Sequence, residues 1–463
     1  MTPAAYALGL LVAALGAKWI AARLRDLLAV GAAYKAKVLC SALFVSGLDL
    51  DVERADEVSA EAYRALRLFG ARVDRERRRV SVSFFGWGER RAVLRPGYGA
   101  ALEAGPVALL PPPPPRASTH RADAPWPAGD ATPTAPPAAV ARVLKDAFAE
   151  HEPRRKRRTR AIVVVQNGKL LAEAYAPGFT PATPLCGWSM TKSAFAVLLG
   201  GLIGEGRLSA SSRGLLPQWA GPGDRRADIT LEDLLRMRSG LLFSEIYSDM
   251  SSDVNRMLFV EPDAGAFAAA RPLEAPPGAR WQYASGTSNI LSLIARRTLG
   301  ERDYPDWPRR ALFEPLGFSD ATLEADASGT FVASSYLFAT ARDWARLGLL
   351  MAQDGVWDGR RLLAEGWVRF LTTPTPQSPQ GRYGAHWWLK LSKELGGQTA
   401  AAARLPADAF HALGHEGQCL TVIASRGLVV VRLGLSIDIS AWDHAAFLDE
   451  LLSALDAPAA PGL

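Results

Sequence analysis

The sequence predicts an α+β fold: an antiparallel β-sheet flanked by helices, with an inserted helical subdomain and an additional N-terminal helix. Four apolar segments have the length and composition of strands, residues 161–165, 169–174, 420–424 and 428–433. The first two surround Asn167-Gly168, a dipeptide typical of a tight hairpin. Turn-rich short helices separate the two strand pairs, and a helix at residues 441–455 follows the second, so both pairs should join in one helix-covered sheet.

The first 26 residues are predicted to form a membrane-anchor helix. Residues Ala4–Ala22 are rich in alanine and leucine, and Lys18 is the only charged residue among them. A cleaved signal peptide and a buried or amphipathic helix are the alternatives. Arg23 and Arg25 follow the apolar run, and the positive-inside rule would then keep the rest of the chain in the cytoplasm.

After the predicted helix at residues 1–26, the chain is predicted to contain three further regions. Residues 27–105 form a small region with a helix at 59–68, a strand at 79–85 and no recognisable chemistry. Residues 106–137 form a linker or a wrapped connection, because proline and alanine dominate and few side chains could pack. Residues 138–463 should form the main domain.

The composition is that of a globular enzyme. Of the 463 residues, 49% are hydrophobic, enough to build one large core. The net charge is only +6, and the concentrated basic run at residues 154–160 contains no aromatic side chain, so no nucleic-acid partner is expected. Cys40, Cys186 and Cys419 show no paired spacing, and the 6 histidines show no zinc motif, so we expect no disulfide framework, metal or other cofactor.

The segment Ser189-Met190-Thr191-Lys192 places a serine and a lysine on one face of a predicted helix. A serine hydroxyl becomes a nucleophile at neutral pH only when a base accepts its proton. Lys192 can be that base if burial lowers its pKa, and the apolar run at residues 193–199 would bury it. The alternative is an ordinary serine near a helix start, beside a solvated lysine.

Two later segments carry side chains that could complete such a site. A turn-rich loop at residues 276–289 contains Tyr283, whose phenol can relay protons, and leads into an apolar helix. Near the C-terminus, Gly414-His415-Glu416-Gly417-Gln418 opens a strand. A glycine at that strand edge would let an acyl group approach the backbone closely.

Together these three motifs resemble those of the serine–lysine acyltransferase superfamily, which includes class C β-lactamases, penicillin-binding proteins, esterases and 6-aminohexanoate-oligomer hydrolases. The resemblance covers residues 138–455 and is closest to the last group. The matching residues are Ser189 and Lys192 for S-x-x-K, Tyr283 and Ser285 for a tyrosine followed two residues later by Asn or Ser, and His415 and Gly417 for Lys or His, any residue, then Gly.

The resemblance implies hydrolysis of a small amide or ester through an acyl-enzyme. Ser189 would attack the acyl carbonyl, while Lys192 and Tyr283 share the proton and pass it to the leaving group. The backbone N–H groups of Ser189 and Gln418 would bind the oxyanion. His415 would position the substrate, and the alternative is a histidine that satisfies a hydrogen bond at the strand edge.

The departures from the β-lactamase pattern favour an amidase or esterase. β-Lactamases usually carry Tyr-x-Asn and Lys-Thr-Gly, whereas this chain has Ser285 and His415 at the corresponding positions. Tyr247 lies in a segment that resembles the substrate-covering segment of the oligomer hydrolases. It would bind a substrate amide there, unless it only packs against the helical subdomain.

Alternative functions and locations follow from the same resemblance. A β-lactamase, a D-Ala-D-Ala carboxypeptidase and a non-catalytic sensor with this fold remain open. Because the superfamily is exported, the resemblance implies a membrane-anchored protein with its catalytic domain in the bacterial periplasm, against the cytoplasmic orientation that the arginines favour. The oligomeric state is left open.

Overall fold

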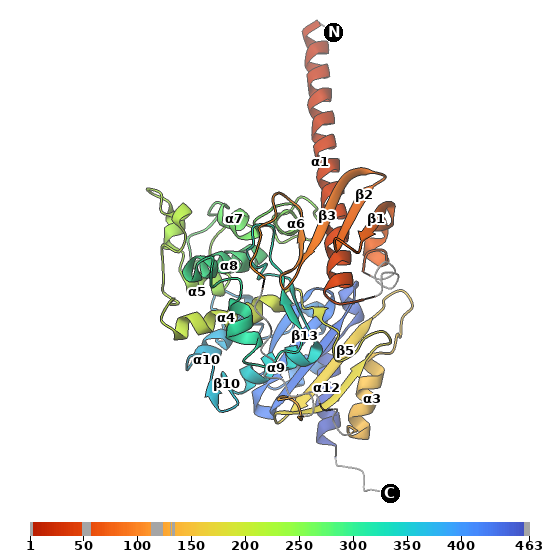
Figure 1. Ribbon diagram of the computed structural model, residues 1–463, viewed down its shortest axis with the longest axis vertical. Helices are drawn as coiled ribbons and strands as arrows, with labels where there is room; N and C mark the ends of the chain where they lie inside the picture. The colour runs from red at the N-terminus through yellow and green to blue at the C-terminus, as the bar shows by residue number, and fades with distance from the viewer. Residues whose placement is uncertain (1–2, 49–56, 113–123, 130, 132–134, 458–463) are drawn as a thin grey trace.

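The computed structural model describes residues 3–48, 57–112, 124–129, 131 and 135–457, except the side chains of residues 3–11, 13 and 20. A large antiparallel sheet and an inserted set of helices form most of the body (Figure 1). The long helix α1 (Pro3–Phe44) projects from the body at one end, and the chain ends after α12 (His444–Asp456) near the other.

The main sheet has 5 strands in the order β12-β13-β14-β5-β6, and all neighbours are antiparallel. The strands are β12 (Phe410–Gly414), β13 (Gln418–Ile423), β14 (Leu428–Gly434), β5 (Thr159–Gln166) and β6 (Lys169–Tyr175). Asn167 and Gly168 have φ values of 50° and 75°, as a two-residue type I′ hairpin requires. Because β14 pairs with β5, strands from both ends of the domain form one sheet, and the predicted α+β fold class is confirmed.

Helices cover both faces of the main sheet because its central strands are apolar on both sides. In β5, every residue from Thr159 to Val165 is buried, so the apolar pattern is continuous and not alternating. Ile162 and Val164 join one cluster of buried side chains, and Val163 and Val165 join the other. The covering helices are α3 (Ala138–Ala147) and α12 on the first face, and α4 (Met190–Gly204) and α9 (Ala341–Ala352) on the second.

The helical subdomain is inserted between α4 and α9. Its helices are α5 (Leu231–Leu235), α6 (Asp253–Phe259), α7 (Ala264–Ala269) and α8 (Ser285–Leu299). A second small sheet has the order β7-β9-β8, with β7 (Leu185–Cys186), β9 (Leu337–Ala339) and β8 (Ala321–Leu323). Later connections contain α10 (Trp367–Thr372), α11 (Ala400–Arg404) and the strand pair β10 (Val356–Trp357) and β11 (Arg360–Arg361).

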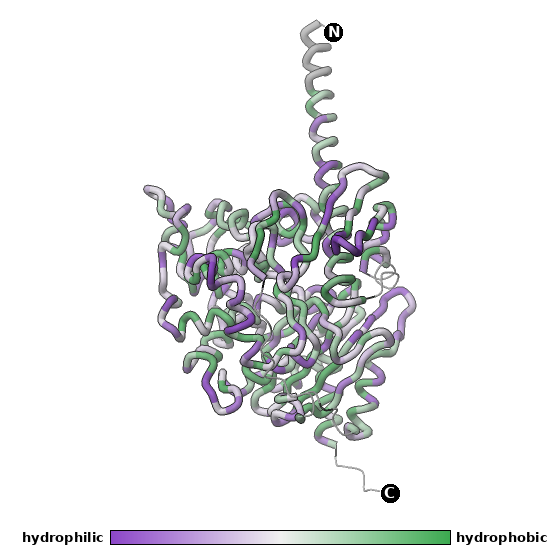
Figure 2. The backbone as a smooth tube through the Cα atoms, in the orientation of Figure 1, coloured by the Kyte–Doolittle hydropathy of each residue, from purple (hydrophilic) through white to green (hydrophobic). Residues whose placement is uncertain are grey.

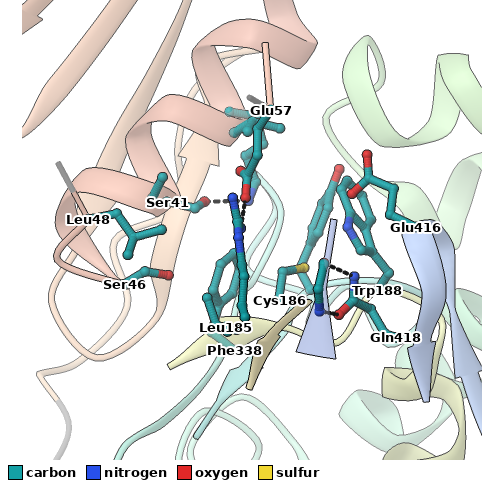
Figure 3. Close-up of a pocket in the computed structure, with 16 residues that line it drawn as sticks. Ser41, Ser46, Leu48, Glu57, Leu185, Cys186, Trp188, Phe338, Glu416 and Gln418 are labelled. Atoms are coloured by element: carbon teal, nitrogen blue, oxygen red, sulfur yellow. Dashed lines mark hydrogen bonds and ion pairs between the residues drawn. The ribbon is translucent and has the colours of Figure 1, made fainter. Parts of the chain in front are cut away.

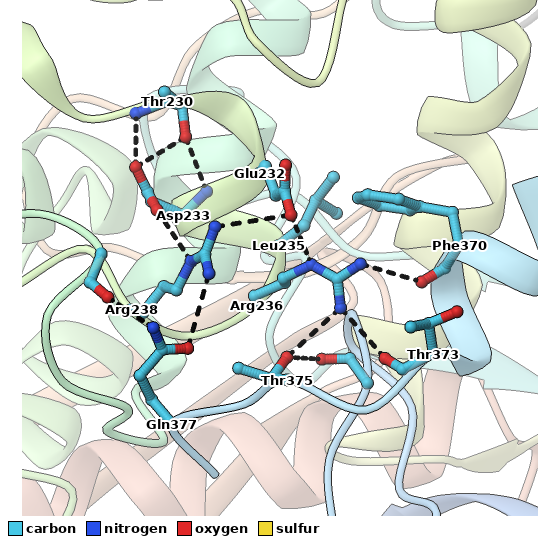
Figure 4. A network of polar contacts seen from close by, with 12 residues as sticks. Thr230, Glu232, Asp233, Leu235, Arg236, Arg238, Phe370, Thr373, Thr375 and Gln377 are labelled. Carbon is cyan, nitrogen blue, oxygen red and sulfur yellow. Dashed lines mark hydrogen bonds and ion pairs between the residues drawn. The ribbon is translucent and has the colours of Figure 1, made fainter. Parts of the chain in front are cut away.

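A polar network fixes the subdomain to the segment that follows α10 (Figure 4). The buried Arg236 donates to the carboxylate of Glu232 at 2.7 Å and to the Thr373 carbonyl at 3.0 Å. Beside it, Arg238 pairs with Asp233 at 2.8 Å, and Asp233 also closes the N-terminal capping box of α5. A buried guanidinium is tolerated only when its donors are satisfied, so this network has one defined geometry.

The small N-terminal region packs α1 against a separate antiparallel sheet in the order β1-β2-β3-β4. Its strands are β1 (Phe69–Asp74), β2 (Arg79–Phe84), β3 (Trp87–Arg95) and β4 (Gly99–Leu102). The predicted strand at 79–85 corresponds to β2, whereas the segment predicted as a helix at 59–68 is a 3₁₀ helix (Glu61–Leu68). Helix α1 does not end at residue 26 but runs on to Phe44. Its later alanines, such as Ala32 and Ala36, are fully buried in this region and attach the second half of the helix to it.

Among the described residues, one helical stretch, Ala14–Phe44 of α1, is long and apolar enough to cross a membrane. Of its most apolar window, 61% is buried in the protein. The preceding part of α1 stands clear of the body (Figure 1). Membrane attachment and a signal sequence are both compatible with this helix, so the predicted anchor stays a prediction.

The N-terminal region is docked to the main domain through buried polar contacts. The buried Glu324 forms an ion pair with Lys37 of α1 and accepts hydrogen bonds from Ser41 Oγ at 2.9 Å and from the Ala100 N–H at 2.7 Å. On the main-domain side, Arg158 of the basic run pairs with Glu61 at 2.7 Å. A buried carboxylate with several donors requires defined geometry, so this region has a fixed place against the main domain.

The proline-rich connection wraps the main domain in the part that the structure describes. Trp126 is buried, and the buried Arg346 of α9 donates to the carbonyl oxygens of Pro127 at 3.1 Å and Gly129 at 3.2 Å. Further upstream, the Ala108 N–H donates to the Ala327 carbonyl at 2.7 Å. These contacts hold the described part of this connection against the main domain.

Candidate active site

Ser189 lies where the chain leaves β7 and enters α4. The Gly187 N–H donates to the Leu337 carbonyl at 2.9 Å, which fixes the turn to β9, and Trp188 takes a left-handed conformation with φ of 46°. Ser189 occupies the N-cap position of α4, yet its side chain makes no capping hydrogen bond. The hydroxyl is therefore available to other partners.

Lys192 is that partner. Its Nζ lies 2.9 Å from Ser189 Oγ and donates to the Ser334 carbonyl at 2.8 Å. The lysine is buried, and this burial lowers its pKa from 10.5 to about 8, although the carboxylate of Glu245 opposes the shift. Asn289 holds Ser334 in place by accepting from its backbone N–H at 3.1 Å.

Tyr283 completes the group around the serine. The Lys192 Nζ lies 5.0 Å from the centre of the Tyr283 ring. Burial and the charge of Glu245 raise the Tyr283 pKa well above its usual range, while a hydrogen bond with the Ser189 side chain opposes this. Trp388 and Tyr383 pack on the Tyr283 ring, at centroid distances of 5.4 Å and 6.0 Å, and hold it in place.

Ser285, the second residue of the predicted tyrosine motif, is fixed by Glu245. The Ser285 N–H donates to a Glu245 carboxylate oxygen at 2.8 Å, and its hydroxyl donates to the other oxygen. Ser285 is the first residue of α8, so the carboxylate lies at the positive end of that helix. Burial raises the Glu245 pKa, and the nearby Lys192 ammonium and the Ser285 bonds oppose that rise.

The third motif forms a tight turn between β12 and β13. The ring of His415 stacks on Tyr247 with a centroid distance of 5.6 Å and meets the edge of Trp188 at 5.6 Å. The side chain of Gln418 ties the turn to β14: its amide N–H donates to the His415 carbonyl at 3.1 Å and to the Gly434 carbonyl at 2.6 Å, and its oxygen accepts from the Gly434 N–H at 2.9 Å. Tyr247 and His415 therefore lie together over the serine loop, as neighbours in one wall.

Glycines bring the first and third motifs together. A Cβ atom on Gly414 would lie 2.2 Å from the Gly187 carbonyl oxygen, so only glycine permits this contact between the two segments. Gly417 has a φ of 81°, and a Cβ there would lie 2.6 Å from a guanidinium nitrogen of the buried Arg432. The turn geometry and Arg432 account for this glycine, in addition to any close approach by an acyl group.

The N-terminal region adds a residue that the sequence did not predict. Tyr63 donates to the Glu416 carboxylate at 2.7 Å, and its oxygen lies 3.0 Å from His415 Nε2. A small cavity of about 40 Å³ separates α1 from the motif residues beside Trp188 and Gln418 (Figure 3). Residues 27–105, predicted to hold no chemistry, therefore touch the candidate site.

All the predicted site residues lie in this one region of the structure, from four different segments. The additional contacts come from Glu245, Tyr63 and the Ser334 carbonyl. Glu245 lies two residues before the predicted Tyr247, whereas no local signal distinguishes Tyr63 or a backbone carbonyl. Among the described residues, no group of three or more metal-ligating side chains is arranged to hold a metal ion.

The helix-covered antiparallel sheet, the helical subdomain and the serine–lysine pair between them define a protein of the serine β-lactamase-like superfamily. Residues 118–434, more than half of the chain, match the model of the beta-lactamase family. The chain belongs to the beta-lactamase family, and the predicted superfamily is confirmed.

Similar proteins include enzymes with several activities. The chain is 28% identical over 253 residues to the 6-aminohexanoate-dimer hydrolase of Paenarthrobacter ureafaciens. The aligned segment covers 50% of this chain and 64% of that relative, which is less than two thirds of the relative's length. A candidate 6-aminohexanoate-dimer hydrolase from Bacillus anthracis has a similar fold, with a TM-score of 0.53 and 20% identity over 75% of this chain and 87% of that one. EstCE1, a hydrolase with promiscuous acyltransferase activity, gives a TM-score of 0.53 at 13% identity, over 69% of this chain and 98% of its own.

Proposed function

We propose that this protein is a serine hydrolase that cleaves an amide or ester bond of a small molecule through an acyl-enzyme on Ser189. The observation that carries the proposal is the 2.9 Å contact between Ser189 Oγ and the buried Lys192 Nζ. Membership of the beta-lactamase family and the similarity to a 6-aminohexanoate-dimer hydrolase support this class of enzyme.

Acylation starts when neutral Lys192 accepts the Ser189 proton as Oγ attacks the acyl carbonyl. With a pKa of about 8, close to a tenth of the lysine is neutral at pH 7, about 300-fold more than at its ordinary value of 10.5. Tyr283, the third member, passes the proton to the leaving group, and water then hydrolyses the acyl-enzyme by the reverse relay.

The oxyanion of the tetrahedral intermediate requires two preorganised donors. We assign these to the backbone N–H groups of Ser189 and Gln418. Loss of one such donor costs about 2.7–4 kcal/mol of transition-state stabilisation in comparable acyl-transfer sites. The side chain of Gln418 is tied to Gly434, so its backbone has the rigidity that this role needs.

Short linear amides and esters are expected to be better substrates than β-lactams. Ser285 and His415 stand where β-lactamases usually carry Asn and Lys, so no permanent ammonium from the third motif attracts a β-lactam carboxylate. We expect kcat/KM for nitrophenyl esters and short amides to exceed that for a chromogenic cephalosporin by a wide margin. Efficient cephalosporin turnover without ester or amide activity would make the protein a β-lactamase, and inactivity on every substrate would favour a sensor.

Turnover should rise with pH until Lys192 is deprotonated. The pKa of about 8 predicts that kcat/KM increases about tenfold per pH unit below pH 8 and levels off above it. Glu245→Gln removes the negative charge that raises the Lys192 pKa, so the rise should move to lower pH, while glutamine still accepts from the Ser285 N–H. The measurement is a pH profile of ester hydrolysis, with Ser189→Ala as the background; a profile that moves to higher pH would contradict the assignment.

A further inference from the structure

Exposed large apolar side chains gather at one end of the molecule, and we call this cluster the apolar rim. It consists of Leu24 and Leu27 of α1, which are 54% and 47% exposed, Leu68, which is 53% exposed, and Phe85 and Trp87 at the β2–β3 turn, which are 73% and 78% exposed. A single exposed apolar residue needs no explanation, but a cluster from three separate segments marks an interaction surface.

The strand register places the apolar rim where α1 leaves the body. Phe69 pairs with Phe84, so the residues Leu68 and Phe85 that flank this pair lie at the same end of the small sheet. A Cβ on Gly31 of α1 would lie 3.0 Å from the Phe69 ring, which puts that end of the sheet beside residue 31. The two leucines of α1 follow within two helical turns, about 10 Å, toward the projecting part of the helix (Figure 1).

Basic side chains surround the same place. Arg23 and Arg25 flank Leu24 in α1, and the side chain of Arg25 is 80% exposed, with the Asp26 carboxylate 3.9 Å away. Figure 2 shows a hydrophilic band on α1 close to the point where the helix meets the body. Arg67 is exposed next to Leu68. Apolar and aromatic side chains bordered by arginines match the boundary between acyl chains and anionic headgroups, where tryptophan and arginine are favoured.

We propose that the apolar rim is a membrane-seating surface that rests on an anionic lipid bilayer, with Phe85 and Trp87 at the depth of the headgroups and the start of α1 continuing into the bilayer. The occupant is a bilayer because the rim is continuous with a projecting apolar helix. This surface adds a second contact, one that fixes how the main domain faces the membrane.

The seating surface also lies close to the candidate active site. Arg23 donates to Ser251, so the segment before α6 reaches the point where α1 leaves the body. Met250 in that segment is 37% exposed, and three residues earlier Tyr247 stacks on His415. Ser251, which contacts α1 at the apolar rim, and Tyr247, which belongs to the wall of the catalytic cleft, are four residues apart in the chain. A bilayer on the apolar rim would therefore lie close to that wall.

Spin-label accessibility in proteoliposomes tests this proposal on the full chain. A label on Trp87→Cys or Phe85→Cys, in vesicles of phosphatidylcholine and phosphatidylglycerol, should be more accessible to oxygen than to a water-soluble nickel chelate. The matched control is Asp358→Cys, in the exposed turn between β10 and β11 at a distance from α1, which should be more accessible to the chelate. Equal chelate access at positions 85, 87 and 358, or a chain that stays outside the vesicle fraction, would overturn the proposal; wild-type protein reports any label on native cysteines.

A second and independent observation concerns the hydroxyl of Tyr63. A tyrosine has one O–H proton, and the Glu416 carboxylate at 2.7 Å is a stronger acceptor than an imidazole nitrogen at 3.0 Å. Because the Tyr63 O–H donates its hydrogen bond to Glu416, the Tyr63 oxygen can only accept from His415. The contact with His415 Nε2 is therefore a hydrogen bond only if Nε2 carries the hydrogen. Neutral His415 then has a lone pair on Nδ1, and no described residue is a partner of that atom.

We infer that Tyr63 is a positioning residue that fixes the Nε2–H tautomer of His415 and leaves Nδ1 as a hydrogen-bond acceptor for the substrate. This inference rests on the proposed function. It names the substrate class more closely: an acyl compound with an N–H or ammonium group near the cleft wall is favoured, and a carboxylate at that position is not. Tyr34 stacks on Tyr63 with a centroid distance of 5.3 Å and supports its position.

Tyr63→Phe tests the assignment because it removes the acceptor and keeps the ring. For a linear amide with a terminal ammonium group, KM should rise by about 3–10-fold, the cost of one hydrogen bond, while kcat/KM for a nitrophenyl acetate should hold. Tyr98→Phe is the matched control: it removes another hydroxyl of the N-terminal region, one that donates to the Pro111 carbonyl at 2.7 Å, and should change neither value. In the wild type, ¹⁵N spectra of labelled histidine should show His415 protonated on Nε2 in its neutral form.

Each outcome separates the tautomer from the proposed function. A wild-type His415 protonated on Nδ1, or equal effects of Tyr63→Phe on both substrates, would overturn the role of Tyr63. Labelling of Ser189 by a fluorophosphonate probe reports the nucleophile independently, so its absence in the wild type would sink the proposed function instead. Labelling of Tyr63→Phe also shows that the variant is folded.

Discussion

Ser189→Ala is expected to abolish turnover and covalent labelling, with a fall in kcat on the order of 10⁶. No other hydroxyl has the buried lysine within hydrogen-bond distance, among the residues that the structure describes. The fold should remain, because the Ser189 side chain makes no capping bond to α4. Ester hydrolysis, reaction with a fluorophosphonate probe and thermal unfolding of the purified full chain together measure these effects.

Ser193→Ala is the matched control for this substitution. Ser193 lies one turn further along α4, is buried, and donates to the His386 carbonyl at 2.6 Å, away from Lys192. Its loss should cost about 1 kcal/mol of stability and leave probe labelling in place. Turnover retained by Ser189→Ala would refute the acyl-enzyme mechanism. If probe labelling were lost only in Ser193→Ala, the nucleophile would have to be reassigned to Ser193.

The main sheet could be predicted because its signals are local. A pattern of only a few residues predicts the Asn167-Gly168 turn and each of the apolar strands β5 and β14. The edge strand β12 was missed, because its short sequence Phe410–Gly414 has little alternation and its turn to β13 lacks a two-residue hairpin signature. The length of α1 could not be read either, since alanines that pack on a protein sheet look like alanines that face lipid.

The contacts of the candidate active site also divide into local and long-range ones. Ser189 and Lys192 are three residues apart on one helix, so their contact follows from helical geometry. Tyr63 and His415 are 352 residues apart, and only the docking of the N-terminal region brings them together. Glu245 reaches Ser285 across 40 residues for a similar reason. Contacts of this kind depend on tertiary packing, which no local pattern encodes.

Lys192→Met should be nearly as damaging as Ser189→Ala, because members of one catalytic unit do not contribute additively. Methionine fills the buried volume without an amine, so the Ser189 proton has no acceptor and the rise in activity toward pH 8 should disappear. Stability should not fall in parallel. A Lys192 pKa lowered from 10.5 to about 8 means that burial of the ammonium costs about 3 kcal/mol below pH 8, and this cost vanishes above the unfolded-state pKa.

The unfolding transition at pH 7 therefore separates a catalytic role of Lys192 from a structural one. We expect Lys192→Met to unfold at the same denaturant concentration as the wild type or at a higher one, while turnover is lost. Lys390→Met, which removes an amine that donates to the Gln380 carbonyl at the surface, should change neither property.

His415→Ala should retain measurable activity, because His415 packs on Trp188 and Tyr247 in the cleft wall and does not contact Ser189 Oγ. If the loss on His415→Ala equalled the loss on Lys192→Met, the base would have to be reassigned to the histidine.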